Sequence, residues 1–248
     1  MLIQEKITVS NILVCVVRPR AEENIFADIV LYHGWGSTAA RQKFRAQILA
    51  SCGYCVYVPE LVNHGERGKA DYLIGKSADI FLQTLEQSLV EFPKLAVHLR
   101  KDRPLFLLGH SLGGLIALGC VHGNAGILSG VAAMNSTIDW NVNDNFFKNI
   151  YLEDDRDAEW NEDIVIRLEA FKPINWSGDA RKIPVLLTNG TLDSTIPADY
   201  NKSYIDEYHP ANVEHLLIED AGHVVTDHTL EAVANFFANI LNGKYERD

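Results

Sequence analysis

Residues 105–113 read Leu-Phe-Leu-Leu-Gly-His-Ser-Leu-Gly and carry the clearest structural signal in the chain. Its first four residues are all apolar, as in a strand that is buried on both faces of a sheet. Its last five residues match G-x-S-x-G, and an apolar helical run begins at Leu112. The pattern alone is weak evidence for a nucleophile. A serine between a buried strand and a helix, however, is typical of a nucleophile held in a sharp turn.

Both glycines of the pattern have a steric reason. A turn this tight forces Ser111 into a strained backbone and brings its neighbours close together, and Gly109 and Gly113 lack the Cβ atoms that would collide. The serine Oγ is left exposed at the edge of the sheet. The backbone N–H of Leu112 lies at a helix N-terminus, where it can stabilise an oxyanion. The alternative is a turn that only packs a helix on a strand.

Apolar β-rich runs alternate along the chain with amphipathic runs at helical spacing. The first two strands are expected to pair antiparallel through Ser10-Asn11. The remaining strands are separated by helices, which predicts a mostly parallel sheet covered on both faces, in a single α/β domain. The eight predicted strands are Leu2–Thr8, Ile12–Arg18, Asp28–Tyr32, Tyr54–Val58, Leu105–Leu108, Leu128–Met134, Val185–Thr188 and Glu214–Ile218.

Helices are expected in the intervals between these strands. Pro93 should break or restart the second helix, because proline cannot donate a backbone hydrogen bond. Helices are predicted from Ser37 or Thr38 to about Ser51, from about Ala78, over Leu112–His122, from Pro197, and from about Leu230 to Leu241.

The interval 138–173 differs from the rest of the chain. It holds ten acidic and four basic residues with interleaved aromatic residues, and it is long for a connection between elements. One interpretation is a solvated excursion with a small core of its own. The other is a helical cap or lid over a pocket.

Two loops further along the chain can supply a base and an acid for the serine. Asp193 follows the predicted strand Val185–Thr188, and His223 follows Glu214–Ile218. Both loops leave the carboxyl ends of strands, the edge at which open α/β sheets place their sites. We therefore expect His223 to take the proton of Ser111 while Asp193 orients the imidazole. Asp220 and Asp227 are rival acids that lie close to His223 in sequence.

The loop after Asp28–Tyr32 contains glycines on both sides of Trp35, so the backbone N–H of Trp35 can complete an oxyanion hole with that of Leu112. The indole ring of Trp35 can line the acyl site or pack on the loop. Three further residues are candidates for the substrate pocket. They are Gly34, His64 and His110, although His64 is favoured as a loop histidine bonded to backbone, and the His110 side chain is expected to point away from the nucleophile.

At these residues the sequence resembles the α/β-hydrolase family, and the resemblance covers essentially the whole chain. The loop Pro59–Arg67 and the segment Pro173–Trp176 are similar to bacterial esterases related to the prolyl oligopeptidase and dienelactone hydrolase groups. Those esterases often carry Asp where this chain has Glu60. Dienelactone hydrolases use a cysteine nucleophile, from which Ser111 departs. The resemblance implies an eight-stranded α/β-hydrolase fold and hydrolysis of a carboxylic ester without a cofactor.

The composition and charge disfavour several classes of binding partner. The net charge of −11 disfavours nucleic acid and anionic membrane surfaces. No apolar run is long enough to span a bilayer, and the N-terminus lacks the features of a signal peptide. The four cysteines are expected to be free thiols in a cytoplasmic protein. Cys52 and Cys55 fit C-x-x-C, but they lie where a helix ends and no second pair completes a zinc site, so no metal is expected.

The sequence thus predicts a serine carboxylesterase acting on short-chain esters, with a small-molecule ester as its partner. The same residues would serve a thioesterase, an amidase or a small peptidase. Because fold does not fix function, a non-catalytic receptor on the same fold is the rival from another class. The oligomeric state and the physiological substrate do not follow from the sequence.

Overall fold

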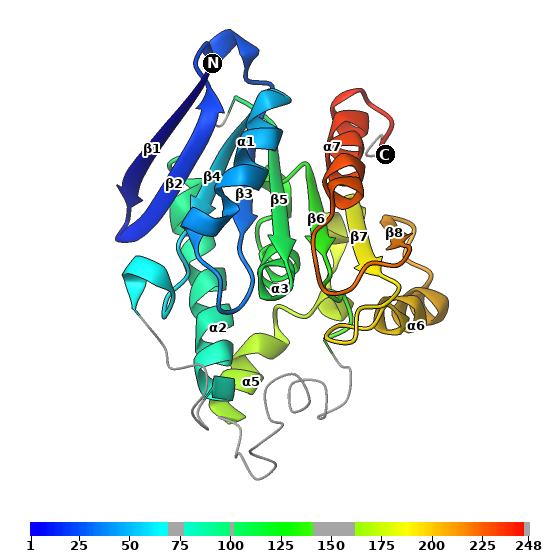
Figure 1. The fold of residues 1–248 in the computed structure, drawn as a ribbon. Coiled ribbons are helices and arrows are strands. Elements are labelled where there is room, and N and C mark those ends of the chain that lie inside the picture. The colour runs from blue at the N-terminus through cyan, green and yellow to red at the C-terminus, as the bar shows by residue number, and fades with distance from the viewer. Residues whose placement is uncertain (69–76, 100–101, 141–161, 246–248) are drawn as a thin grey trace.

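The strand β5 (Leu105–His110) lies inside an eight-stranded sheet in the computed structural model, which describes residues 1–68, 77–99, 102–140 and 162–245 (Figure 1). The order of the strands is β1-β2-β4-β3-β5-β6-β7-β8. The strands β3 to β8 run parallel, and β2 is antiparallel to both of its neighbours. The predicted sheet is confirmed. The other strands are β1 (Leu2–Val9), β2 (Ile12–Pro19), β3 (Ala27–Tyr32), β4 (Tyr54–Pro59), β6 (Gly130–Met134), β7 (Val185–Gly190) and β8 (Val213–Ile218).

The first two strands form the expected hairpin. Ser10 and Asn11 connect them with φ angles of 49° and 69°. Two successive residues in the left-handed region make the tight turn that matches the twist of paired strands.

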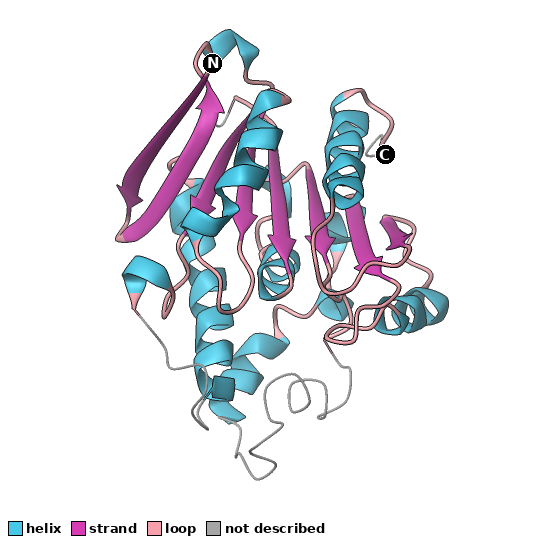
Figure 2. Ribbon diagram, in the orientation of Figure 1, coloured by secondary structure: helices cyan, strands magenta, loops and turns pink. Residues whose placement is uncertain are grey.

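Helices cover both faces of the sheet (Figure 2). The helices α1 (Lys43–Ser51) and α7 (Asp227–Leu241) pack on one face, where the rings of Phe106 and Phe237 stack with centroids 4.3 Å apart. The other face carries α2, α3 and α6, whose apolar residues join a second buried cluster. These helices span Ser77–Ala96, Leu112–Gly119 and Asp199–Tyr208.

The helix α2 continues through Pro93, so the expected break is wrong. Pro93 is exposed, and the helix therefore loses one hydrogen bond on its solvent side. Leu89, Phe92 and Leu95 stay buried around it. The apolar face of the helix thus offsets the loss, as packing commonly does for helices in proteins.

Other helix boundaries shift by a few residues. Thr38 does begin the predicted helix, since its side chain accepts a hydrogen bond from the Arg41 N–H, but the first turn is a 3₁₀ helix. The last helix starts earlier than expected because Thr226 and Thr229 form a capping box. The 3₁₀ helices are η1 (Glu22–Asn24), η2 (Ala39–Gln42), η3 (Gly65–Arg67), η4 (Ala125–Ile127), η5 (Pro173–Asn175) and η6 (Gly178–Lys182).

The acidic interval 138–173 is described only at its two ends, and residues 141–161 lie outside the described residues. The helix α5 (Glu162–Glu169) lies against α2, and Arg167 forms an ion pair with Glu86 of that helix (Figure 1). Trp140 and Leu168 belong to the main buried cluster, so these two residues do not form a separate core.

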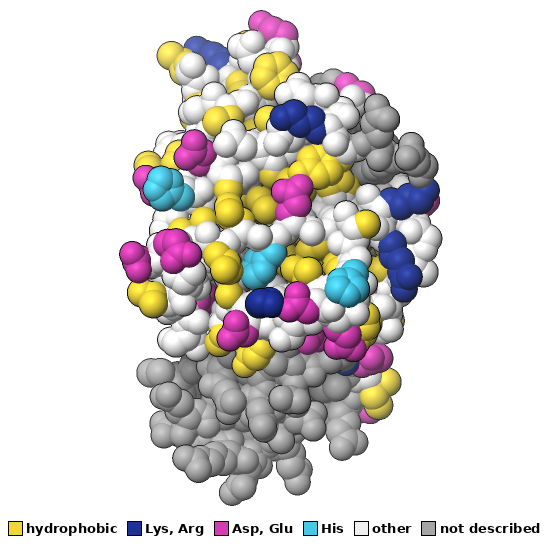
Figure 3. Space-filling view, turned by 90° about the vertical axis from the view of Figure 1, so that its right-hand side faces the viewer, with side chains coloured by type: hydrophobic (Ala, Val, Ile, Leu, Met, Phe, Trp, Pro, Cys, Tyr) yellow, Lys and Arg dark blue, Asp and Glu magenta, His cyan; other side chains and the backbone are white. Residues whose placement is uncertain are grey.

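The strand β8 is an edge strand of the sheet. Figure 3 views this side, where hydrophobic, acidic and histidine side chains lie among one another. Leu216 and Leu217 are 40% and 46% exposed on this strand. In the described residues no helix is both long and apolar enough to cross a membrane.

Candidate active site

Ser111 stands in the sharp turn between β5 and α3. Its φ and ψ angles are 56° and −120°, a strained combination for a residue with a side chain. A Cβ on Gly109 would lie 1.9 Å from the Gly113 carbonyl oxygen, and one on Gly113 would lie 2.2 Å from the Tyr32 oxygen. The clash expected within the turn is confirmed for Gly109, whereas at Gly113 the close neighbour is the backbone at the end of β3.

The surroundings of Ser111 fix its backbone. Its N–H donates to the Met134 carbonyl at 2.9 Å, and its own carbonyl accepts from the Ser136 hydroxyl at 2.9 Å. Leu112 is the first residue of α3, where backbone N–H groups have no acceptor within their own helix. The first turn of α3 is therefore a site at which negative charge is stabilised.

His223 and Asp193 meet at the same edge of the sheet. The Nδ1–H of His223 donates to Asp193 Oδ2 at 2.8 Å. The two loops approach closely because Gly190 has no side chain: a Cβ there would lie 2.1 Å from the Ala221 oxygen. His223 is 24% exposed at its side chain, whereas that of Asp193 is fully buried. The structure thus brings together the acid and the histidine that the sequence singled out.

The Asp193 carboxylate is held ionised. Burial opposes its ionisation, but hydrogen bonds from His223, from the backbone N–H of Ile196 and from Asn135 outweigh burial and lower the pKa of Asp193. The other oxygen, Oδ1, accepts from the N–H groups of Thr195 and Ile196 at 2.9 Å each. A charged, oriented carboxylate is what keeps a catalytic histidine in the required tautomer.

The rival acids are placed differently. Asp220 and Asp227 are both exposed. Asp227 accepts a hydrogen bond from the His228 N–H at the start of α7. Within the described residues, the carboxylate that bonds His223 Nδ1 is that of Asp193.

His110 does not turn away from the site, so that expectation is wrong. Its ring centroid lies 5.0 Å from that of His223, and a Cβ on Gly34 would lie 3.2 Å from its Nδ1. Burial lowers the pKa of His110 to about 3, and the charge of His223 adds to this effect. His110 is therefore a neutral ring packed between the loop after β3 and the loop that carries His223.

Gly34 lets the loop after β3 approach Ser111 closely. A Cβ at this position would lie 3.4 Å from the Cβ of Ser111. The Trp35 ring packs edge-on against His64 at 5.1 Å and against Phe81 at 5.4 Å. The indole thus packs on the loop after β4 and on α2, and its role in lining an acyl site stays a prediction.

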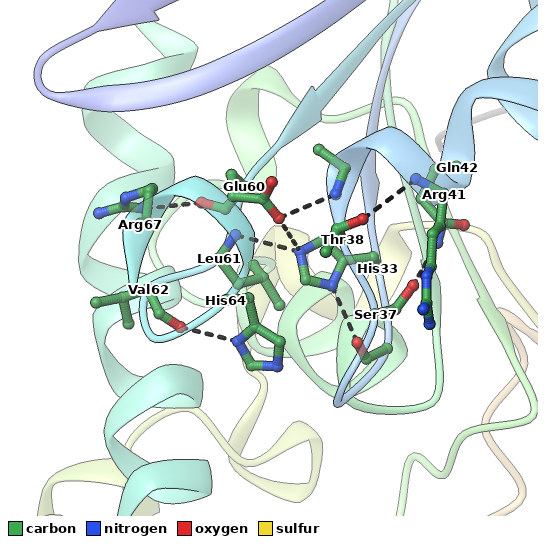
Figure 4. A network of polar contacts seen from close by, with 12 residues as sticks. His33, Ser37, Thr38, Arg41, Gln42, Glu60, Leu61, Val62, His64 and Arg67 are labelled. Atoms are coloured by element: carbon green, nitrogen blue, oxygen red, sulfur yellow. Dashed lines mark hydrogen bonds and ion pairs between the residues drawn. The ribbon is translucent and has the colours of Figure 1, made fainter. Parts of the chain in front are cut away.

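His33 and Glu60 form a buried pair that the sequence did not predict, and Glu60 also bonds the backbone just beyond the loop after β3 (Figure 4). His33 Nε2 lies 3.1 Å from Glu60 Oε1, and the same oxygen accepts from the Ala39 N–H at 3.0 Å. Burial opposes ionisation of Glu60, but these hydrogen bonds outweigh it and lower the pKa of the carboxyl. The position of Glu60 after β4 and of His33 after β3, at adjacent strand ends, is a signal that could have revealed the pair.

His64 is a fully buried histidine of the same network (Figure 4). Its Nδ1–H donates to the Val62 carbonyl at 2.9 Å, and its Nε2 accepts from the Gly36 N–H at 3.1 Å. Burial lowers the pKa of His64 to about 4. Both ring nitrogens bond to backbone groups, so His64 connects the loop after β4 to the loop after β3.

The part of the chain that the structure describes contains no group of three or more His, Cys, Asp or Glu residues able to hold a metal ion. All four cysteines are unpaired. The groups described at this edge of the sheet are a strained serine, an imidazole bonded to a carboxylate, and the backbone N–H groups of the first turn of α3.

Several known proteins are similar to this chain in sequence. The Alpha/beta hydrolase family matches residues 29–236 of the chain. Esterase YjfP of Escherichia coli (strain K12) is 25% identical over 218 residues, which cover 84% of this chain and 87% of that protein. YitV of Bacillus subtilis (strain 168) is 31% identical over 116 residues, 44% of each chain.

The fold also has solved relatives. The crystal structure of TT1662 from Thermus thermophilus superposes with a TM-score of 0.75 at 19% identity, covering 97% of this chain and 98% of that one. At this identity the likeness concerns the fold alone.

Proposed function

The chain belongs to the alpha/beta hydrolase family, and we propose that it is a serine esterase that cleaves short-chain carboxylic esters through an acyl-enzyme on Ser111. The observation that carries the proposal is the 2.8 Å hydrogen bond between Asp193 and His223, at the sheet edge where Ser111 stands in a strained turn. The likeness to Esterase YjfP over most of both chains supports the ester as substrate.

The first half of the reaction acylates the serine. Ser111 Oγ attacks the ester carbonyl while His223 Nε2 takes its proton, and Asp193 stabilises the imidazolium that forms. The backbone N–H groups of Leu112 and Trp35 donate to the oxyanion of the tetrahedral intermediate. When the intermediate collapses, the C–O bond to the alcohol breaks and His223 gives its proton to the leaving oxygen.

The second half returns the free enzyme. A water molecule gives a proton to His223 and attacks the acyl carbonyl, and a second oxyanion forms in the same hole. Its collapse breaks the bond to Ser111 Oγ, which recovers the proton from His223. The acid is released, and no cofactor takes part.

Two features outside the site belong to the same proposal. We propose that α5, the described end of the acidic interval, belongs to a cap beside the site, which is supported by its packing on α2 near the carboxyl ends of the strands. We also propose that the enzyme works in the cytoplasm, for which the four unpaired cysteines are the support.

The test is hydrolysis of p-nitrophenyl esters from acetate to decanoate by the wild type, Ser111→Ala and Ser88→Ala. Ser88 is the matched control, because its buried hydroxyl donates to a backbone carbonyl within α2. We expect turnover of the shorter esters, a loss of about 10³-fold or more in Ser111→Ala, and wild-type rates in Ser88→Ala.

Other results would redirect the assignment. Faster turnover of the matching thioester or anilide would point to a thioesterase or an amidase with the same residues. A folded wild type that cleaves none of these substrates would contradict the esterase proposal and favour a non-catalytic receptor. Activity that survives in Ser111→Ala would remove Ser111 as the nucleophile.

A further inference from the structure

Asn135 occupies an unusual position directly after β6. Its φ angle is 47°, in the left-handed region that asparagine tolerates better than most residues. The side chain is almost completely buried. The backbone N–H donates to the Thr188 carbonyl at 2.6 Å, which ties the end of β6 to β7. Asn135 is thus fixed at the carboxyl edge of the sheet, among the loops that carry the proposed catalytic groups.

The side-chain amide of Asn135 donates two hydrogen bonds, one to the loop that carries Asp193 and one to the loop that carries His223. Its Nδ2 donates to Asp193 Oδ2 at 3.0 Å and to the Gly222 carbonyl at 2.9 Å. Gly222 is the residue before His223. A single buried amide therefore contacts the carboxylate of the acid and the backbone beside the base.

The contact to Asp193 falls on the oxygen that also accepts from His223. The opposite oxygen is held by the N–H groups of Thr195 and Ile196. With donors on both oxygens, the carboxylate cannot rotate without breaking hydrogen bonds to a charged group, which are among the stronger ones in proteins. Asn135 thus fixes which oxygen faces the imidazole.

The next residue extends the same connection to the nucleophile. The Ser136 hydroxyl donates to the Ser111 carbonyl at 2.9 Å, and a Cβ on Gly114 would lie 2.4 Å from the Ser136 Cβ. The two residues after β6 therefore contact the nucleophile turn, the acid and the histidine loop.

We propose that Asn135 is a positioning residue, which holds Asp193 and His223 in the register that proton transfer from Ser111 requires. The inference rests on the proposed function, because it assigns His223 as the base. Asn135 itself does not touch the reacting atoms. Its role is to keep the carboxylate oriented and the His223 backbone at a fixed distance from it.

The test compares Asn135→Asp, Asn135→Gly and a control. Asn135→Asp keeps the shape but replaces the donor with a carboxyl oxygen next to Asp193. Asn135→Gly removes the amide and suits the left-handed φ angle. Asn212→Asp is the control: its amide donates to the Ile183 carbonyl at 2.7 Å, at the opposite end of β7 and β8.

We expect kcat to fall about 100-fold in Asn135→Asp and about tenfold or more in Asn135→Gly, with KM changing less than about threefold, because misplacement by less than 1 Å is enough. A second carboxylate stabilises the protonated, inactive imidazole. The acidic limb of the kcat/KM profile should therefore move up by about one pH unit in Asn135→Asp. The Asn212→Asp profile should match the wild type.

Proton NMR gives a readout that does not need turnover. The hydrogen-bonded Nδ1 proton of His223 should give a low-field signal in the wild type and in Asn212→Asp, and the signal should shift or exchange away in both Asn135 variants. An unchanged low-field proton with an unmoved acidic limb in folded Asn135 variants would overturn the inference, even if their activity fell. If the wild type cleaves no ester, the esterase proposal fails while this signal still decides the role of Asn135.

Discussion

Gly113 in the first turn of α3 lies against the backbone of Tyr32 at the end of β3. A Cβ on Gly113 would be 2.2 Å from the Tyr32 carbonyl oxygen and 2.8 Å from that of His33. The backbone of α3 and the end of β3 thus meet without a side chain between them. Because α3 and β3 approach so closely, the loop after β3 lies beside Ser111.

Gly113→Ala should therefore destabilise the protein by about 3 kcal/mol, because the added methyl group meets backbone atoms that cannot move aside independently. Urea unfolding measures the change. Gly126→Ala is the matched control, since nothing lies within 4 Å of a Cβ at that glycine and its φ angle is not in the left-handed region. The control should change the free energy of unfolding by less than about 0.5 kcal/mol. Equal effects of the two substitutions would show that the close approach is not what requires a glycine.

Asp193→Asn should lower kcat by about 10⁴-fold while leaving the fold intact. The amide keeps the shape of the side chain but cannot stabilise an imidazolium, and it favours the wrong tautomer of His223. The measurement is kcat on the best p-nitrophenyl ester.

Asp220→Asn is the control for this substitution. Asp220 has a φ angle of 57°, which asparagine tolerates, and its side chain is exposed. Its kcat should stay within about twofold of the wild type. A large loss in Asp220→Asn with a small one in Asp193→Asn would transfer the role of the acid to Asp220.

Glu60→Ala should cost about 3 kcal/mol of stability, because it leaves His33 and the Ala39 N–H buried without their shared acceptor. Glu60→Gln keeps an acceptor oxygen and should cost about 1 kcal/mol. The loop after β3 should lose rigidity in both, so kcat should fall in the same order. Thermal unfolding and ester turnover provide the two measurements.

The control for Glu60 lies a few residues away. Glu66 forms an exposed ion pair with Lys6, so Glu66→Gln should change stability by less than about 1 kcal/mol. If Glu60→Ala were as stable as Glu66→Gln, the buried pair would not be what holds the loop.

The protein should lose stability as the pH falls from about 6.5 toward 4. Burial lowers the pKa of His64 to about 4 in the folded state, whereas an unfolded histidine titrates near 6.5. Between these values the unfolded chain binds a proton that the folded chain does not. The free energy of unfolding therefore decreases as the pH decreases. One such histidine accounts for a slope of about 1 kcal/mol per pH unit.

His64→Gln should reduce that slope, although its stability at pH 7 should be lower because the contacts to Val62 and Gly36 change. His228→Gln, at an exposed histidine of α7, is the control and should leave the slope as it is. Denaturant unfolding at several pH values measures both. A slope that is the same in His64→Gln and in the wild type would exclude His64 as a source of the acid sensitivity.

Much of the site could be predicted because each proposed catalytic residue lies in the connection that follows a predicted strand. Ser111 directly follows β5, and Asp193 and His223 lie in the loops after β7 and β8, at the same edge of the sheet. Parallel strands make that edge common to all of them, so their meeting follows from strand order alone. The local pattern failed at Pro93, where packing of the buried face of α2 outweighs one lost hydrogen bond.

Residues that support the site were harder to predict. Asn135 lies after a strand too, but a lone asparagine in a loop has many ordinary roles, and only its contacts to Asp193 and Gly222 single it out. The same holds for His33 and Glu60, whose hydrogen bond joins residues 27 positions apart. The ring of His110 was expected to face away, and the structure packs it on His223 instead.

The sheet, its mostly parallel order, the serine turn and the candidates for acid and base could be predicted, because they depend on hydrophobic period, glycine positions and chain order. The structure was needed to show which acid bonds His223, where the Trp35 and His110 rings pack, and which buried polar groups hold the loops. The difference lies in how far apart the interacting residues are in sequence. Periodicity acts within one element, whereas a buried hydrogen bond or ring contact depends on side chains that approach one another only after the sheet has formed.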